Sequence, residues 1–417
     1  MELNNIKNTD SFGWKEKFIL VFLPFAMGYF LSYLFRSVNA VISPNLVSEF
    51  ELSASELGLL TSVYFLSFAS LQIPIGLLLD RFGPRRTNAC LLIVAGVGAC
   101  IFSSAQNFEG LLLGRVFIGF GVAACLMSSI KVFSIWFSPE ILSTMIGRIM
   151  FVGGLGAISA TKPVEMLLRV TGWREIFLGL AFLVIAASIV VFFVVPEKKF
   201  ERSTASFREQ LSGAFGVYRS PVFWRIAMGT ALFQAFNMSV QGLWAGPWLA
   251  DVAGLSRADV ANHLMGLGVS TMLGFLFWGA FATYLAKRGI QAIQLLIVAT
   301  ALYLLLQLLL VFGLSELSWV IWIGWGLLGT SGSLAFTIIS QSFPLSMTGR
   351  TTTALNLLVF VTAFLSQWIF GVILNQWELV GTGYNPEGYA VAFGIFMALQ
   401  LFGFVWMVVG YRRGKPV

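Results

Sequence analysis

Long apolar segments repeated along nearly the whole chain restrict its fold more than any other feature. A helix needs about 20 apolar residues to cross the hydrocarbon core of a bilayer. Windows of that length predict twelve spans, near residues 18–43, 57–79, 87–105, 110–136, 143–169, 173–195, 222–250, 262–285, 290–312, 318–343, 349–377 and 387–411. With 58% hydrophobic and 11% charged residues, the chain also lies outside the range of soluble globular proteins. We therefore expect an all-α membrane protein.

The basic residues predict the orientation of these spans. Most of the 26 Lys and Arg residues fall in connections on the same side as both termini, whereas Arg169, Arg174 and Arg257 fall on the other side. Cytoplasmic connections are enriched in Lys and Arg, so both termini should be cytoplasmic. The net charge of +7 then reflects membrane orientation and gives no reason to expect a nucleic-acid partner. We expect a multi-pass protein of a bacterial inner membrane.

The longest hydrophilic stretch divides the chain near its middle. It is rich in Lys, Glu, Arg and Ser, and it separates two groups of six predicted spans. The expected organisation is a cytoplasmic leader (1–17), a six-helix half (18–195), a cytoplasmic linker (196–221), a second six-helix half (222–411) and a cytoplasmic tail (412–417).

A short charged connection joins the second and third predicted spans. It reads Gly76-Leu77-Leu78-Leu79-Asp80-Arg81-Phe82-Gly83, followed by Pro84, Arg85 and Arg86. The carboxylate of Asp80 falls at the C-terminal end of a helix, where the helix dipole disfavours it. It therefore needs nearby cations or the N-terminus of another helix, and a bond of that kind can break and re-form.

This connection resembles the signature between the second and third helices of the major facilitator superfamily. The run Leu112-Leu113-Gly114-Arg115 with Gly119 and Gly121 is similar to the fourth-helix motif of that family. The resemblance implies two pseudo-symmetric six-helix halves, with a site between them near mid-membrane and transport by alternating access. It also implies gating roles at the cytoplasmic side and in the fourth span, for which the candidates are Asp80, Arg81, Arg85, Arg86 and Arg115.

Charges inside predicted spans are expensive in hydrocarbon and are therefore functional candidates. Arg36 in the first span follows Tyr29 and Tyr33 at helical spacing, so the three side chains should share one face. A guanidinium suits a carboxylate or a phosphate group. We interpret this face as an anion clamp, and the alternative is a structural ion pair between Arg36 and Glu165.

The other candidates in the first half are Lys131, Lys162 and Glu165. Lys162 and Glu165 are three residues apart in span five, on either side of Pro163, and we expect Lys162 to bind substrate and Glu165 to exchange a proton. A local ion-pair brace is the alternative for both. Lys131, near the cytoplasmic end of span four, is a candidate for attracting an anion, and an ammonium that extends to the interface is its alternative.

Span seven contributes a stripe of amides and an indole, formed by Gln234, Asn237, Gln241 and Trp244. Such a face is typical of a cavity wall for an organic substrate, and hydrogen bonding between helices is the alternative. The same region lacks the second arginine that is usual in the organophosphate branch, which the chain resembles loosely.

Together these features predict a secondary transporter for a small organic anion, either a carboxylate or a phosphorylated metabolite. Coupling of this transport to protons is a further hypothesis. The alternatives are an exporter of amphipathic drugs or siderophores and a receptor with a transporter fold. An enzyme is not expected, because the sequence has no recognisable nucleophile–base pair, metal-ligand cluster or phosphate loop. We expect no cofactor, and we expect the protein to be a monomer in the lipid bilayer.

Overall fold

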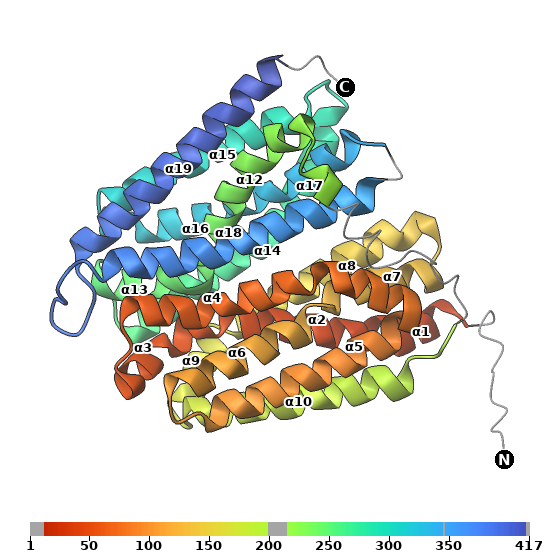
Figure 1. The fold of residues 1–417 in the computed structure, drawn as a ribbon, viewed down its shortest axis with the longest axis horizontal. Helices are drawn as coiled ribbons and strands as arrows, with labels where there is room; N and C mark the ends of the chain where they lie inside the picture. The colour runs from red at the N-terminus through yellow and green to blue at the C-terminus, as the bar shows by residue number, and fades with distance from the viewer. Residues whose placement is uncertain (1–11, 199–214, 345–346, 414–417) are drawn as a thin grey trace.

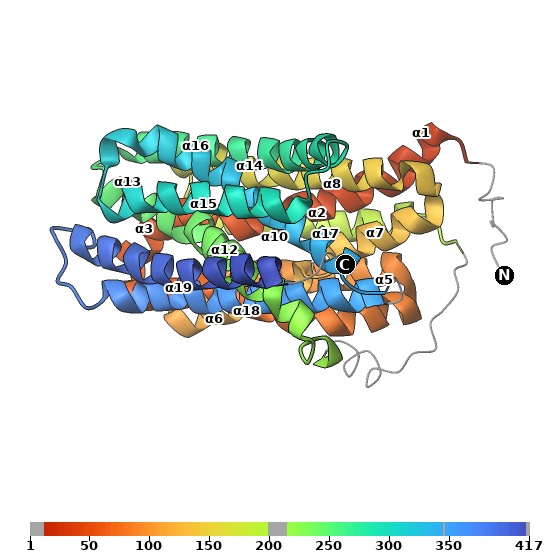
Figure 2. The same cartoon turned by 90° about the horizontal axis from the view of Figure 1, so that it is seen from above.

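The computed structural model describes residues 12–198, 215–344 and 347–413, and these residues form two helical bundles side by side. Figure 1 shows the first half of the chain as the lower bundle and the second half as the upper one. The helices run roughly along one axis in both views (Figures 1 and 2). The helix α1 and the C-terminal end of α19 lie at the same end of the molecule, which we call the inner end, following the predicted orientation.

The first bundle contains the helices of the N-terminal half. They are α1 (Trp14–Lys17), η2 (Phe18–Phe22), α2 (Leu23–Ser37), α3 (Asn39–Phe50), α4 (Ala54–Ser70), α5 (Gln72–Ser104), α6 (Phe108–Val122), α7 (Cys125–Trp136), α8 (Pro139–Ser159), α9 (Lys162–Leu168) and α10 (Trp173–Val194).

The second bundle contains the helices of the C-terminal half. They are α12 (Pro221–Ser239), η3 (Val240–Trp244), α13 (Ala245–Asp251), α14 (Arg257–Ala286), α15 (Ala292–Val311), η4 (Ser315–Leu317), α16 (Ser318–Gly329), η5 (Thr330–Gly332), α17 (Ser333–Gln341), α18 (Thr348–Leu374) and α19 (Pro386–Arg413).

These helices follow the twelve predicted spans in order. Ten segments among the described residues are long and apolar enough to cross a membrane as they stand. The second span consists of α4 and the first part of α5, which turns at Gly83 (φ 81°) into the third span. The seventh span is α12, η3 and α13 in succession. Parts of the predicted leader, linker and tail (1–11, 199–214 and 414–417) lie outside the described residues.

The two halves pack closely along the outer parts of their helices. Between α4 and α18, a Cβ on Gly58 would come within 2.8 Å of the Gln367 carbonyl oxygen, and one on Gly371 within 2.2 Å of the Ala54 carbonyl oxygen. Polar bonds follow the same seam, as the Gln367 amide donates to Thr61 Oγ1 (2.5 Å). Small residues permit helices in a membrane to approach in this way.

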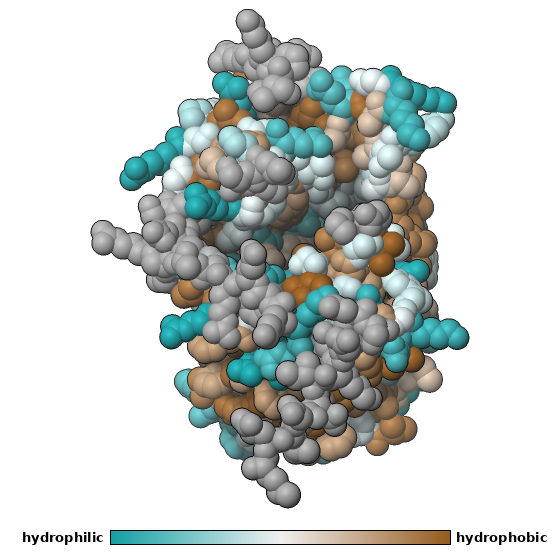
Figure 3. All heavy atoms as spheres, turned by 90° about the vertical axis from the view of Figure 1, so that its right-hand side faces the viewer, coloured by the Kyte–Doolittle hydropathy of each residue, from teal (hydrophilic) through white to brown (hydrophobic). Residues whose placement is uncertain are grey.

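A second contact between the halves, between α8 and α14, reaches mid-molecule and then ends. Between α8 and α14, a Cβ on Gly154 would come within 2.7 Å of Met272, but Gly147 and Gly279, seven residues further inward, have no neighbouring atom within 4 Å of a Cβ. Figure 3, which views the inner end, shows a recess between the two bundles with hydrophilic residues around it. Along α8 and α14, the halves are therefore joined in their outer parts and parted toward the inner end.

Within the first bundle, glycines hold α6 against α5, and this contact gives a test of the packing. A Cβ on Gly121 would lie 2.2 Å from the Ala95 backbone nitrogen, whereas Gly179 has no neighbouring atom within 4 Å. Gly121→Ala should destabilise the protein by about 1–3 kcal/mol through overpacking. Gly179→Ala is the matched control and should leave stability unchanged or raise it, because alanine favours a helix more than glycine. Thermal unfolding of the two purified variants measures this difference, and equal midpoints would contradict the close packing.

Candidate functional site

A small cavity lies between the two bundles at mid-molecule, and it contains much of the predicted site. Its volume is ≈ 30 Å³, which is room for about two water molecules. The α2 and α8 helices supply one wall, and α12, η3, α14 and η5 supply the other. The lining residues are Tyr33, Arg36, Ser37, Gly154, Ala157, Gln234, Asn237, Met238, Gln241, Gly242, Gly268, Thr271, Phe275 and Thr330.

Arg36 is the one charged residue among the described residues that line this cavity. Its guanidinium carbon lies 5.1 Å from the ring centre of Tyr33 and 5.9 Å from that of Phe65. Apart from these ring contacts, Arg36 has no hydrogen bond or ion pair with any described residue, and its side chain is half-buried. The ion pair with Glu165, the alternative for this residue, is absent: the carboxylate of Glu165 is bound elsewhere. The fork of Arg36 is thus available to an anion.

The two tyrosines of the predicted clamp lie beside Arg36 in different ways. Their rings meet edge to face with centres 5.1 Å apart. Tyr33 lines the cavity, whereas Tyr29 is buried and donates its hydroxyl to the Met150 sulfur (3.3 Å). The structure therefore brings Tyr33 to the cavity and places Tyr29 behind it as a support.

The opposite wall carries two amides pressed against a break in the tenth span. There α16 ends and η5 begins, and the glycines of this break face α12. A Cβ on Gly332 would lie 1.9 Å from Gln234 Oε1, and a Cβ on Gly329 would lie 2.2 Å from Asn237 Oδ1. Both amide oxygens are buried without a hydrogen-bond partner among the described residues. Buried polar atoms in proteins are usually satisfied, so these two oxygens are acceptors that still need a donor.

The other two residues of the predicted stripe, Gln241 and Trp244, lie in different surroundings. Gln241 lines the cavity and donates an amide hydrogen to Thr271 Oγ1 (2.9 Å). Trp244 does not reach the cavity: it is fully buried, donates to the Gln367 carbonyl (3.0 Å) and stacks on Phe370. The reason is the π-helical turn η3, whose wider spacing moves residues out of the register of an ordinary helix. The prediction of Trp244 as a cavity residue is therefore wrong for this conformation.

Lys131 is also placed differently from its prediction as an anion-attracting residue. Its ammonium lies 3.0 Å from Asp80 Oδ1, near the inner end. This pair provides the cation that Asp80 requires at the end of its helix. Arg85 and Arg86 instead bind Glu197 at the end of the sixth span, both at 3.1 Å.

The remaining gating candidates belong to the first bundle as well. The guanidinium carbon of Arg81 lies 5.5 Å from the ring centre of Phe82 at the inner end. Arg115 is buried far from there, where it donates to the Phe35 carbonyl (3.0 Å) and faces the Tyr64 ring. All of these contacts lie within the first bundle, so among the described residues the predicted inner charge cluster does not connect the two halves in this conformation.

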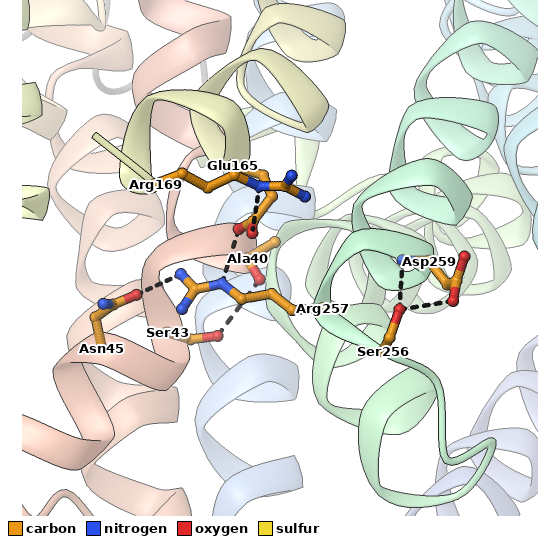
Figure 4. Close-up of polar contacts among 8 residues, drawn as sticks. All are labelled: Ala40, Ser43, Asn45, Glu165, Arg169, Ser256, Arg257 and Asp259. Carbon is orange, nitrogen blue, oxygen red and sulfur yellow. Dashed lines mark hydrogen bonds and ion pairs between the residues drawn. The ribbon is translucent and has the colours of Figure 1, made fainter. Parts of the chain in front are cut away.

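Glu165 lies at the outer end and bridges the halves. Its Oε2 accepts a hydrogen bond from Arg257 Nε at 2.7 Å, and Arg257 Nη2 donates to Asn45 Oδ1 at 2.6 Å (Figure 4). Arg169, one turn along α9, lies 3.9 Å from the same carboxylate. Lys162 begins α9 with an exposed side chain outside the cavity, so the structure does not unite it with Glu165 or Arg36.

Sequence reasoning missed Arg257, Thr271 and the two glycines of the tenth span. Arg257 was assigned only as a basic residue of an outer connection, and its pairing partner is 92 residues away in the chain. Gly329 and Gly332 frame the polar pair Thr330-Ser331, which is the sequence signal that could have indicated a break in the helix. Within the described residues, no group of three or more His, Cys, Asp and Glu side chains is placed to hold a metal ion.

Two helical bundles with a polar cavity between them define a class of membrane carriers. The chain belongs to the Major Facilitator Superfamily, whose family model matches residues 25–366. It is a multi-pass membrane protein.

Relatives of this chain carry the names of transporters. The chain is 21% identical to the hexuronate transporter of Bacillus subtilis, over 96% of this chain and 97% of that protein. It is 25% identical to the probable L-galactonate transporter of Escherichia coli, over 63% of this chain and 61% of that protein. It is 22% identical to the cis,cis-muconate transport protein of Acinetobacter baylyi, over 83% and 84%.

Solved structures support the fold. A bacterial homologue of the human lysosomal transporter Spinster, inward-facing and occupied, superimposes with a TM-score of 0.76 and 17% identity, over 97% of this chain and 100% of that chain. The D-xylose–proton symporter gives a TM-score of 0.74 and 15% identity, over 93% and 97%.

The contact between Gln234 and the tenth span yields a test of the cavity. A methyl group on Gly332 would occupy the place of Gln234 Oε1 and push this amide into a cavity of ≈ 30 Å³. Gly332→Ala should therefore weaken binding of an organic acid roughly tenfold, about 1.4 kcal/mol, which is in the range of overpacking effects. Gly279→Ala, where nothing lies within 4 Å, is the control. Titration calorimetry with D-galacturonate compares the two, and equal affinities would exclude Gln234 from the site.

Proposed function

We propose that this protein is a secondary transporter for a small organic anion, and that the preferred ligand is a hydroxylated monocarboxylate. The observation that carries the proposal is Arg36, half-buried at mid-molecule without a hydrogen bond or ion pair to a described residue. An isolated charge at this depth is costly unless water or an anionic ligand compensates it. A carboxylate fits the planar fork of the guanidinium with two parallel hydrogen bonds.

The charge of the cavity favours a carboxylate over a phosphate ester. Arg36 is the one charged lining residue in the described part of the cavity, so it balances a single negative charge. A phosphate monoester carries ≈ −1.5 to −2 charges at neutral pH, which would leave part of its charge uncompensated. The match is therefore closest for a monoanion.

The amides on the opposite wall favour hydroxyl groups on the same ligand. The oxygens of Gln234 and Asn237 lack donors, and a hydroxyl can both donate to them and accept from the amide nitrogen. Removing a required partner from buried polar groups lowers affinity strongly, so an acid without hydroxyls should bind less well. The names of the hexuronate and galactonate transporters among the relatives agree with this ligand class.

Transport would proceed by alternating access across the bacterial inner membrane, with both termini in the cytoplasm. The closed outer end and open inner end correspond to one of the two states that such a cycle needs. Proton coupling through Glu165 stays a prediction, because no carboxylate lines the central cavity in the residues described. Glu165 would then have to couple transport to protons through its contact between the halves at the outer end.

The first test of this function removes the charge of Arg36. Arg36→Gln should weaken binding of D-galacturonate by about 1.5–3 kcal/mol, the range for hydrogen bonds to charged groups, which is roughly 10- to 150-fold. Arg36→Lys should restore only part of the loss, since an ammonium lacks the planar fork. Binding to purified protein is measured for D-galacturonate, cis,cis-muconate, a sugar phosphate and a hydrophobic amine. The proposal would be refuted if the wild type bound the amine and if Arg36→Gln left the affinity for every acid unchanged.

The second test concerns closure of the inner end. In the outward-facing state this end must close, and α18, which begins there at Thr348, offers its N-terminus to the carboxylate of Asp80. Asp80→Asn should therefore lower turnover more than substrate affinity and favour the inward-open state. A reporter cysteine at Gly147→Cys, in a background without Cys90, Cys100 and Cys125, should react faster with a hydrophilic maleimide added from inside.

The control for this test is Glu197→Gln, which removes a neighbouring carboxylate that binds Arg85 and Arg86 within the same bundle. It should change the labelling rate less than Asp80→Asn. Unchanged labelling together with intact transport in Asp80→Asn would contradict the gating role.

A further inference from the structure

The carboxylate of Glu165 lies between two arginines that belong to different halves. Arg257 begins α14 in the second bundle and approaches it to 2.7 Å. Arg169 directly follows α9 of the first bundle, four residues after Glu165, and lies 3.9 Å from its carboxylate. Glu165 is 6% exposed, so its charge needs at least one of these cations in every state of the protein.

Among the described residues, Arg257 has no second carboxylate partner comparable to Glu165. Both of its side-chain hydrogen bonds cross to the first bundle, to Glu165 and Asn45. The nearby Asp259 is engaged by Ser256, whose hydroxyl donates to it at 2.6 Å. Figure 4 shows Asp259 on the far side of Ser256, away from the arginine. When the outer ends separate, Glu165 keeps Arg169, whereas Arg257 loses its carboxylate.

A second, larger cavity lies directly at this arginine. Its volume is ≈ 620 Å³, and its lining comes from both halves: α3, α4 and α9 on one side, and α13, α14 and the segment after α18 on the other. Arg257 is the one basic residue among the described lining residues, and Glu51, Glu165 and Asp251 are the acidic ones. Asp251 is held within the second bundle by the Tyr389 hydroxyl (2.7 Å). Arg257 is therefore the one position in the described lining where a cation can pair with an anion.

We propose that Arg257 is a second carboxylate subsite at the outer mouth, which Glu165 covers while the outer end is closed and releases to Arg169 when it opens. The inference rests on the proposed function for the nature of the ligand. Opening transfers the Glu165 carboxylate from one arginine to the other, so the incoming anion meets an uncovered guanidinium before it reaches Arg36. Closing restores the Arg257–Glu165 pair and displaces the anion inward.

If the Glu165 carboxylate moves between the two arginines, replacing each arginine should change the outer-open population in opposite directions. Arg257→Gln removes the partner that favours the closed outer end, so it should raise the outer-open population at least threefold. Arg169→Gln removes the partner that favours opening, so it should lower that population at least threefold. Arg169→Lys keeps the charge and should behave as wild type.

Distances between spin labels at Gln106→Cys and Leu314→Cys, both on exposed outer connections, measure these populations in full-length protein in nanodiscs. The background again lacks the native cysteines. Shifts of opposite sign support the transfer. Shifts of the same sign, or no shift with Arg169→Gln, would overturn it. If the arginines only braced α9, removing either one would loosen the outer end.

Sided transport tests the subsite itself. With D-galacturonate in oriented proteoliposomes, Arg257→Gln should raise the KM for the outer side at least threefold and leave the KM for the inner side unchanged. Equal changes on the two sides would overturn the subsite. If neither D-galacturonate nor cis,cis-muconate is transported by the wild type, the proposed function fails, and the spin-label distances still decide the transfer.

Discussion

Compensation of charge inside the bilayer is the constraint on which this structure depends. Asp80 has Lys131, Glu165 has Arg257 and Arg169, and Arg115 has the Phe35 carbonyl and the face of Tyr64. All of these contacts except the one between Glu165 and Arg169, which are four residues apart, join helices that are distant in the sequence. Arg36 differs from these residues in the described part of the chain, because its side chain contacts only aromatic rings and lines a polar cavity. The other charges are compensated by contacts within the protein, whereas the charge of Arg36 remains for a ligand to compensate.

Close helix packing decides where that ligand can enter. The glycines of α4 and α18 bring the two halves into backbone contact at the outer end, and the Arg257–Glu165 pair closes the same end beside them. Inward of Gly154 and Met272, α8 and α14 separate, and a recess lies between the bundles at the inner end (Figure 3). We infer that an anion reaches Arg36 from the inner end in this conformation. A second state requires the outer contacts to part while the inner carboxylate of Asp80 finds a new partner.

The sequence alone predicted the fold well, because hydrophobic length and basic connections report directly on a membrane. Helical spacing also placed five candidate residues on inward faces, and all five line the central cavity, whereas their role in binding stays a prediction; they are Tyr33, Arg36, Gln234, Asn237 and Gln241. It failed for Trp244, where a π-helical turn changes the register, and for Lys131, whose partner Asp80 lies 51 residues away. Pairing between distant segments, as in Glu165 with Arg257, depends on the relative position of the two halves, which local spacing does not encode.

The central claim is that the cavity at Arg36 recognises a negative charge. It is tested most directly by comparing one ligand with its neutral form, galacturonate with galacturonamide, in binding to wild-type protein. The hydroxyl groups are the same in both, so the difference isolates the carboxylate. The acid should bind at least tenfold more tightly than the amide, and Arg36→Gln should remove this preference. Equal affinities of the acid and the amide for the wild type would contradict it.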